Sequence, residues 1–292
     1  MTSNPELVAT VRRAKRRGVM ARLIRHRSGR IGLLLTAFFI LMAVLGPYLT
    51  PYDPTGSDFM HLSAGISRAH WLGTDNFGRD ILSRILLGAR YSIGIGLSAT
   101  ALGAFVGGLW GLWSGYAAGT LDAVSMRVVD VMLAFPGLLI AIGLITITGP
   151  GVGPVIFASS LFGVPIFARL TRASVLAAKE RVFVEAARGL GATHGRIVFS
   201  HLLPNVIAPV IVYATLRTGV TLLVASGLSF LGLGVQPPTP EWGSMLSDAQ
   251  LYLTIDPLMA FAPGVTITLA VLGFNLLGDG LRDVLDPTLR QQ

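Results

Sequence analysis

Residues 92–116 read SIGIGLSATALGAFVGGLWGLWSGY, an uncharged and largely apolar run. A bilayer core is about 30 Å thick, and a helix needs roughly 20 apolar residues to cross it. In this run Gly103, Gly107, Gly111 and Gly115 recur at every fourth position, along one helical face. Small residues at that spacing let a second helix approach closely within a membrane. The segment therefore predicts a spanning helix packed tightly against another helix, of this chain or of a second one.

The composition of the whole chain points to the same environment. Of the 292 residues, 52% are hydrophobic and 13% are charged, and the mean hydropathy is +0.66. A soluble fold of this composition would have too few polar side chains to cover its surface. We therefore predict an all-α membrane protein with six transmembrane helices, at residues 31–49, 92–116, 131–148, 152–168, 209–233 and 258–277.

The positive charges are unequally divided between the two sides that these spans create. Eighteen of the 23 Lys and Arg residues lie on the side of the termini, and four lie on the other side. Since loops rich in Lys and Arg stay in the cytoplasm, both termini are predicted to be cytoplasmic. Residues 1–30 then form a basic cytoplasmic tail, and residues 31–292 form a single six-helix domain. The net charge of +8 arises mainly from this asymmetry, so no nucleic-acid partner is expected.

The segment 50–90 is predicted to be extracytoplasmic and to have two parts. Proline and glycine residues make the first part a loop. The second part, 74–90, is predicted to be an amphipathic helix lying on the membrane. In it Asp75 with Arg79, and Asp80 with the arginine four residues later, form acid-first pairs one helical turn apart. This helix is either part of a docking face for a soluble partner or a connector that begins the second span.

The sequence lacks the common means of driving transport or catalysis. A phosphate-binding P-loop requires Gly-Lys followed by Ser or Thr, but Lys15 and Lys179 each follow an alanine. The six predicted spans contain no Asp or Glu, which ion-coupled carriers usually place there. There is no cysteine, and the five histidines form no His-Glu-x-x-His motif. We expect neither a cofactor nor a metal nor a catalytic group in this chain.

One charged residue, Arg217, lies inside a predicted span. An arginine within a bilayer must face protein or a water-filled path, because lipid solvates a charge poorly. It is therefore a candidate to line a substrate path and attract a carboxylate. The alternative is a structural pairing with carbonyl groups or with a partner subunit.

Between the fourth and fifth spans, residues 171–205 are too polar to cross the membrane and rich in helix-forming residues. We predict a helix over 172–190, a break at Gly191, and a second short helix over 194–203 that Pro204 ends. Ala186 and Ala187 would then present a small-residue surface suited to a partner's groove. The charged residues Glu185 and Arg188 flank this surface.

This loop resembles the EAA loop of ABC importer permeases, in which a helix rests on the ATPase subunit. The resemblance is carried by Glu185-Ala186-Ala187, by Gly191 six residues after the glutamate, and by Leu203-Pro204. Longer segments, at 71–84, 236–243 and 275–283, resemble the C-type permease of dipeptide, oligopeptide, glutathione and nickel importers.

The resemblance implies a type I ABC importer permease fold in a bacterial cytoplasmic (inner) membrane. It implies a heterodimer with a B-type permease, an extracytoplasmic substrate-binding protein, and two ABC ATPases, or one fused ATPase, that bind ATP and Mg. Peptide is the expected substrate and nickel an alternative; a self-sufficient secondary carrier or channel is the alternative from another class. The residues implied to couple to the ATPase are Glu185, Ala186, Ala187, Arg188, Gly191, Leu203 and Pro204. The candidates to face the binding protein are Asp75, Arg79, Asp80, Gln236, Glu241 and Trp242.

After the sixth span, Asp279, Asp283 and Asp286 lie on one face of a predicted helix. Carboxylates on one helix converge poorly on a single cation. We therefore expect them to pair with arginines of the cytoplasmic loops or of the ATPase rather than to bind a metal.

Overall fold

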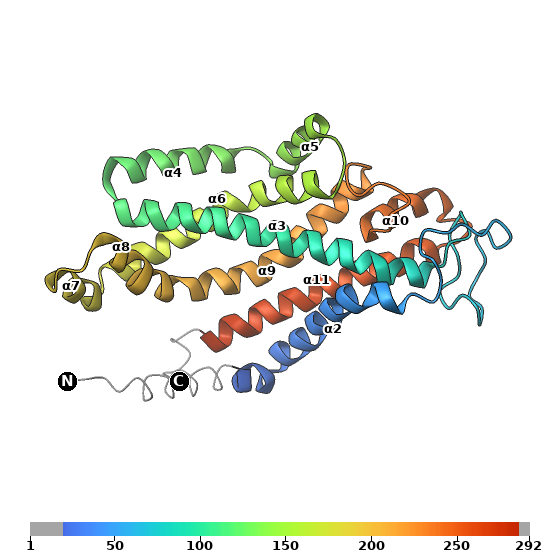
Figure 1. Ribbon diagram of the computed structural model, residues 1–292, viewed down its shortest axis with the longest axis horizontal. Helices are drawn as coiled ribbons and strands as arrows, with labels where there is room; N and C mark the ends of the chain where they lie inside the picture. Colours follow the sequence, from blue (N-terminus) through green and yellow to red (C-terminus); the bar gives the residue numbers. More distant parts are fainter. Residues whose placement is uncertain (1–19, 286–292) are drawn as a thin grey trace.

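The computed structural model describes residues 20–285, and within this range the chain is mostly helical and has no β-strand (Figure 1). Five helices in this range are long and apolar enough to cross a membrane. They are α2 (Arg27–Leu49), α3 (Ile81–Ala117), α6 (Val152–Lys179), the continuous helix His194–Phe230, and α11 (Leu258–Leu285). The fourth of these consists of α8 (His194–Arg196), a π-helical turn (Ile197–Leu202) and α9 (Leu203–Phe230). The predicted all-α membrane fold is confirmed.

The third predicted span is not one straight helix. Its place is taken by α4 (Gly119–Ala134) and α5 (Gly137–Thr148), which are bent by 85° relative to each other. The break falls at Phe135 and Pro136, where Phe135 has an extended backbone. Proline lacks the N–H of a helical residue, and its ring disfavours helical geometry in the residue before it. Six spans result only if this bent pair is counted as one.

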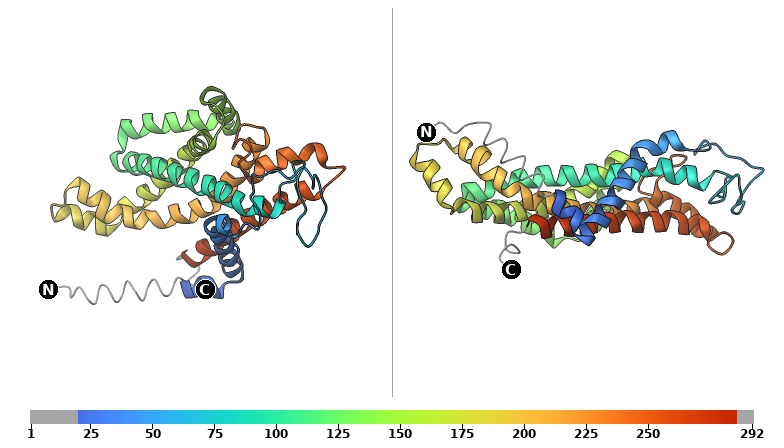
Figure 2. Two further views of the ribbon diagram at one scale, coloured as in Figure 1. Left: turned by 45° about the vertical axis from the view of Figure 1, so that its right-hand side comes forward. Right: turned by 90° about the horizontal axis from the view of Figure 1, so that it is seen from below.

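The helices form an elongated bundle with two distinct ends (Figures 1 and 2). Helix α3 contacts α6 most extensively, and α2 pairs with α11. Helix α7 (Val182–Gly189) lies with α8 at one end of the bundle. The loop that precedes α3 and helix α10 (Trp242–Ala249) lie at the other end. We refer to these as the α7 end and the α10 end.

The four regularly spaced glycines of α3 all lie against α6. A Cβ atom on Gly107 would lie 2.3 Å from the carbonyl oxygen of Val164, and one on Gly111 would lie 2.2 Å from that of Ala168. A Cβ atom on Gly103 or Gly115 would lie 2.9 or 3.0 Å from a backbone oxygen of α6. Because the side chains are absent, the two helices approach each other backbone to backbone. This close contact is made within the chain.

The separate helix predicted over 74–90 is not present. Residues up to Asp80 form a loop, and α3 begins at Ile81 and continues without a break to Ala117. The side chain of Asp80 accepts a hydrogen bond from the backbone N–H of Ser83, 2.8 Å away, and so caps the start of α3. Such an N-cap satisfies one of the backbone donors that the first turn leaves unpaired. The acidic residue that was expected inside a helix therefore starts one.

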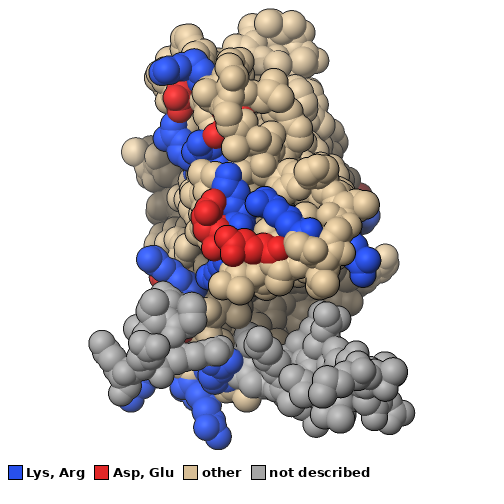
Figure 3. Space-filling view, turned by 90° about the vertical axis from the view of Figure 1, so that its left-hand side faces the viewer, with Lys and Arg blue, Asp and Glu red and all other residues tan. Residues whose placement is uncertain are grey.

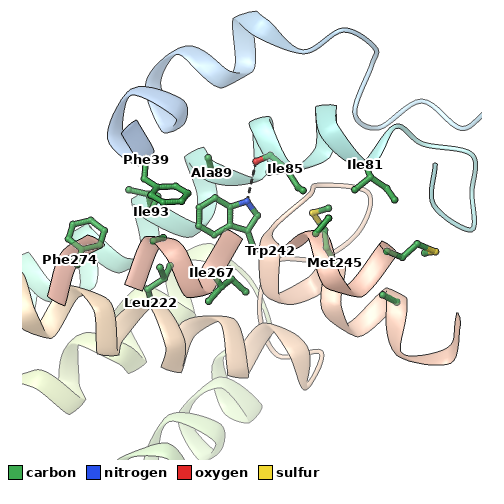
Figure 4. Close-up of a cluster of buried hydrophobic side chains, with 14 residues drawn as sticks. Phe39, Ile81, Ile85, Ala89, Ile93, Leu222, Trp242, Met245, Ile267 and Phe274 are labelled. Atoms are coloured by element: carbon green, nitrogen blue, oxygen red, sulfur yellow. Dashed lines mark hydrogen bonds between the residues drawn. The ribbon is translucent and has the colours of Figure 1, made fainter. Parts of the chain in front are cut away.

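A buried cluster around Trp242 joins α10 to four other helices near the α10 end (Figure 4). The indole Nε1 donates a hydrogen bond of 3.1 Å to the backbone oxygen of Ile85 on α3. Phe39 of α2 contacts the indole edge to face, with the ring centroids 5.9 Å apart. Leu222 of α9 and Ile267 of α11 complete the contacts. A buried tryptophan needs a partner for its N–H, and this one finds it on α3.

Candidate functional site

The short helix α7 is held between two long helices at one end of the molecule (Figure 1). Helix α6 ends at Lys179, and a turn at residues 180–181 leads into α7. After α7, Gly191 adopts φ +76°, which reverses the chain before α8 begins. Glycine accepts this conformation because it has no Cβ atom to clash with the backbone. An independent eight-residue helix thus connects the ends of two spanning helices.

Two details of the predicted loop are wrong. The helix expected over 172–190 is interrupted at residues 180–181, and its first part belongs to α6. Pro204 does not end a helix, since the chain passes through a π-helical turn and continues as α9. Membrane helices tolerate proline where such local adjustments satisfy the backbone groups that it leaves free. Both changes make the connection between α7 and the spans more direct.

Helix α7 has one buried and one exposed face. Val184 and Ala187 are buried, and Val184 packs with apolar residues of α3, α6 and α9, whereas Glu185, Ala186 and Arg188 are exposed. Ala187 therefore belongs to the core, which corrects the expectation that both alanines are on the surface. Charged side chains of both signs gather on this end of the molecule (Figure 3). Large apolar side chains exposed here are Val182, Leu190 and Phe199.

The C-terminal end of α3 contacts the segments before and after α7. The Lys179 Nζ donates a hydrogen bond of 3.4 Å to the backbone oxygen of Gly115. The Tyr116 hydroxyl lies 2.5 Å from the Nδ1 atom of His194, at the start of α8. Helix α7 is therefore anchored at both ends to the same spanning helix.

Ion pairs join α6 to α4 near the same end. Arg172 of α6 donates to Asp122 of α4 through Nε and Nη2, at 2.6 and 2.5 Å. Arg169 of α6 donates to Asp130 of α4 at 2.5 Å. A guanidinium that donates two parallel hydrogen bonds to a carboxylate fixes its orientation as well as its distance. Movement of the end of α6 is thus linked to α4.

At the α10 end, two arginines and two aspartates form a compact network. Asp75 accepts from Arg79 Nε at 2.6 Å and lies 3.4 Å from Arg84 Nε. Asp248 of α10 lies 3.5 Å from the Nη2 atom of Arg79 and 3.8 Å from that of Arg84. Burial raises the pKa of the Asp248 carboxyl, although the positive charges of Arg84 and Arg79 offset part of this effect. The network joins the loop before α3 to α10.

Five of the six residues expected to face a soluble partner are buried in this chain. Their exposed fractions are 5% for Asp75, 4% for Arg79, 3% for Asp80, 1% for Glu241 and 0% for Trp242. Charged side chains are buried only when they are paired, and these have partners within the chain. They offer no docking surface in this structure, so that interpretation is replaced by an internal, structural one.

The internal role of the segment before α10 is visible in its hydrogen bonds. Glu241 accepts a hydrogen bond of 2.8 Å from the Ser92 hydroxyl of α3 and caps α10 by accepting from the Ser244 N–H at 3.0 Å. Gln236 is exposed, and its amide donates to the backbone oxygens of Gly232 and Gly234. Of the six candidates, Gln236 alone keeps a surface position.

Arg217 lies near the middle of α9 and is 9% exposed. Its Nε and Nη2 atoms are buried and make no hydrogen bond to any described residue. The guanidinium carbon lies 4.8 Å from the ring centroid of Phe162 on α6. A cation over an aromatic ring is attracted to it, but the ring accepts no conventional hydrogen bond. Leaving a buried donor unpaired costs about 1–3 kcal/mol, and more for a charged group.

The acidic face after the sixth span is partly described. Asp279 and Asp283 are exposed on α11, and Asp283 lies 3.5 Å from the Nε2 atom of His26. Asp286 lies outside the described residues. Between residues 20 and 285, no group of three or more His, Cys, Asp or Glu residues is placed to hold a metal ion.

Two residues of these sites gave no signal in the sequence. Asp248 has no charged residue three or four positions away, and its partners are more than 150 residues away. Phe162 is one apolar residue among many in its span. Covariation between distant positions is the signal that could have revealed either one.

The described chain thus has five helices able to cross a membrane, or six with the bent pair counted as one, and a short helix held at one end of the bundle. Comparison with known proteins identifies the class. A family model described as "Binding-protein-dependent transport system inner membrane component" matches residues 107–291. A second, the "N-terminal TM domain of oligopeptide transport permease C", matches residues 16–65. The chain belongs to the family of binding-protein-dependent transport system inner membrane components and is an ABC importer permease of the C type.

Curated relatives cover almost the whole chain. The glutathione transport system permease protein GsiD of Pectobacterium atrosepticum is 44% identical over 270 residues, which are 92% of this chain and 90% of that protein. The dipeptide transport system permease protein DppC of Alkalihalophilus pseudofirmus is 43% identical over 274 residues, which are 94% of this chain and 90% of that protein.

A solved structure supports the fold. A chain of the MetNI methionine ABC transporter in an inward-facing conformation superimposes with a TM-score of 0.55 at 18% identity, covering 70% of this chain and 97% of that chain. The predicted type I importer permease fold is confirmed. As members of this family do, the chain works with a partner permease, ATPase subunits and a substrate-binding protein.

Proposed function

We propose that this chain forms one half of a membrane path through which short peptides, such as dipeptides, oligopeptides or glutathione, enter a bacterial cell. The names of the relatives support this substrate class, and they do not favour nickel. The other half of the path would be a B-type permease. Two ATPases, or one fused ATPase, would bind ATP and Mg on the cytoplasmic side, and a binding protein would deliver peptide to the opposite side.

The placement of α7 carries this proposal. It is a separate helix at one end of the molecule, and its exposed face presents Glu185, Ala186 and Arg188. The Glu185 side chain makes no hydrogen bond or ion pair with the described part of the chain. A charged group without a partner, beside small and apolar exposed side chains, suits a contact with another protein. The excess of Lys and Arg supports a cytoplasmic location for this end and for both termini.

We infer a mechanism of alternating access from the connections of α7. Closure of the ATPases on ATP would displace α7, and α6 and the helix that continues into α9 would follow because α7 joins them directly. Arg172 and Asp122 would pass the movement to α4. The path between the two permeases would then open toward the binding protein. This chain would contribute no catalytic group, and ATP hydrolysis would occur on its partners.

The test is ATP-driven peptide uptake by the complete system in proteoliposomes, with wild-type chain and the Glu185→Lys variant. Reversal of one charge in an interface pair costs about 2–5 kcal/mol, so we expect uptake to fall at least about tenfold while the complex remains assembled. Glu180→Lys makes the same change at an exposed position in the turn before α7 and is expected to keep uptake within about twofold.

Three outcomes would contradict the proposal. Normal uptake by Glu185→Lys would remove α7 as the coupling contact. An equal loss in Glu180→Lys would mean a general effect of charge at this end rather than a specific contact. Peptide flux through the chain without ATPases would favour a self-sufficient carrier or channel.

A further inference from the structure

The guanidinium of Arg217 is a buried cation whose donors are unused in this chain. It lies inside a spanning helix, and its Nε and Nη2 atoms have no hydrogen-bond partner among residues 20–285. No described carboxylate lies within ion-pair distance of it. Buried polar groups in folded proteins are nearly always paired, and an exception calls for an explanation. A missing anionic partner is the simplest one.

Phe162 covers this guanidinium and is itself placed by the broken span. The Phe162 ring lies so close to Gly137, the first residue of α5, that a Cβ atom there would lie 1.5 Å from two ring atoms. The same ring lines a cavity of about 260 Å³ between α6 and the bend that joins α4 to α5. The other lining residues are apolar or glycine, among them Leu133, Phe135 and Ile166. The apolar cavity and the unpaired cation thus both adjoin the Phe162 side chain.

We propose that Arg217 binds a carboxylate of the transported peptide, that Phe162 is the movable cover of this site, and that the adjoining cavity receives an apolar side chain of the same peptide. The inference rests on the proposed import of peptides and adds a recognition site within the membrane path. Guanidinium and carboxylate match in charge and in geometry, because two parallel N–H donors can meet the two carboxylate oxygens. Both buried donors would then be satisfied.

The cavity limits what can enter it. Pockets that enclose a whole small molecule usually measure about 300–1,000 Å³, so this one suits a single side chain. Its lining discriminates against charged side chains, since a charge buried there would have no partner. The site therefore fits a peptide with a free carboxylate next to an apolar residue.

The experiment measures equilibrium binding to the assembled complex of both permeases and the ATPases in lipid nanodiscs, without the binding protein. The probes are radiolabelled dialanine and dialanine amide, which lacks the free carboxylate. We expect the wild-type complex to bind the acid about tenfold more tightly than the amide, as one charge-assisted pair provides. Arg217→Gln should abolish this preference. Arg127→Gln, which removes an exposed arginine of α4, should retain it.

The second variant, Phe162→Leu, keeps the site apolar but removes the ring from the guanidinium. We expect it to bind dialanine about threefold more tightly than wild type, with unchanged affinity for the amide. If the complex with Arg217→Gln fails to assemble, Phe162→Leu tests the proposed site. An unchanged affinity of Phe162→Leu for dialanine would overturn the proposal.

Two other results would overturn the proposal: equal binding of acid and amide by the wild-type complex, or a preference for the acid that survives Arg217→Gln. Either result would assign Arg217 to a structural contact with the partner permease. ATP-driven uptake of dialanine by the complete wild-type system is measured in parallel. Its absence would contradict the proposed function itself, whereas uptake without a preference for the acid contradicts only this site.

Discussion

Replacing Gly107 by alanine tests the contact that holds the bundle together. A Cβ atom at this position would lie 2.3 Å from the carbonyl oxygen of Val164 and 2.8 Å from the Cβ of Phe167. Carbon atoms at optimal separation are about 3.5–4.0 Å apart, so α3 and α6 would have to separate by about 1 Å along their closest contact. Extra atoms in a well-packed interior typically cost about 1–3 kcal/mol.

The next residue provides a matched control. A Cβ atom on Gly108 would meet only the Thr171 hydroxyl oxygen, 3.9 Å away, which is an ordinary contact. Glycine to alanine in a helix interior contributes roughly 0.8–1.0 kcal/mol of helix propensity, and both variants gain it equally. The difference between Gly107→Ala and Gly108→Ala therefore isolates the clash, and we expect about 1–3 kcal/mol in favour of Gly108→Ala.

The assay is thermal unfolding of the purified chain in detergent, followed by the loss of the monodisperse peak in size-exclusion chromatography. Since 1 kcal/mol shifts Tm by about 2–4 °C in a chain of roughly this size, we expect Gly107→Ala to unfold several degrees below Gly108→Ala. Equal Tm values would show that the two helices can separate without cost, and the close packing of α3 on α6 would then not stabilise the fold.

Three further variants probe the two ends of the molecule. Gly191→Val places a β-branched residue at φ +76°, which costs about 1–3 kcal/mol and should displace α7, so ATP-driven uptake should fall. The control Gly189→Ala, within α7, should keep wild-type uptake. Equal uptake by the two variants would contradict a role for the turn at Gly191. Asp75→Asn should cost about 3–5 kcal/mol, measured by the same unfolding assay, because it leaves two buried arginines short of a partner. Asp248→Asn should instead be neutral or stabilising at pH 7, because a raised pKa means that the fold favours the neutral carboxyl. The stability that protonated Asp248 contributes is fully present below its unfolded pKa of 3.8 and is lost as pH rises through the raised folded pKa. The stability of Asp248→Asn relative to wild type should therefore increase with pH. A difference in stability that does not change with pH would refute this prediction.

The functional site was only partly predictable from the sequence. The Glu185-Ala186-Ala187 segment and the break at Gly191 marked the connecting helix, because a helix-breaking residue and a helix-forming run are local features. Which face of α7 is exposed was not predictable. Ala187 is buried on the same face as Val184, which packs against apolar residues of α3, α6 and α9, and no local pattern encodes that contact.

The internal ion network illustrates the same limit. The sequence offered Arg79 as a partner for Asp75, four residues away, and the structure contains that pair in a loop rather than in a helix. Asp248 completes the network because α10 folds back against α3. Five of the six residues expected to face the binding protein are therefore internal, and they form no charged docking face in this structure.

The sequence by itself determined the class of protein and the positions of five apolar helices. A helix that crosses lipid unbroken needs an apolar run of a minimum length, and the regular glycines of α3 mark where one such helix meets another. Only the tertiary structure decided the 85° bend between α4 and α5, the burial of the Asp75 network and the contact of Arg217 with Phe162. The length of an apolar run is a local property of the chain, whereas the partner of a buried charge depends on which distant residues the fold brings beside it.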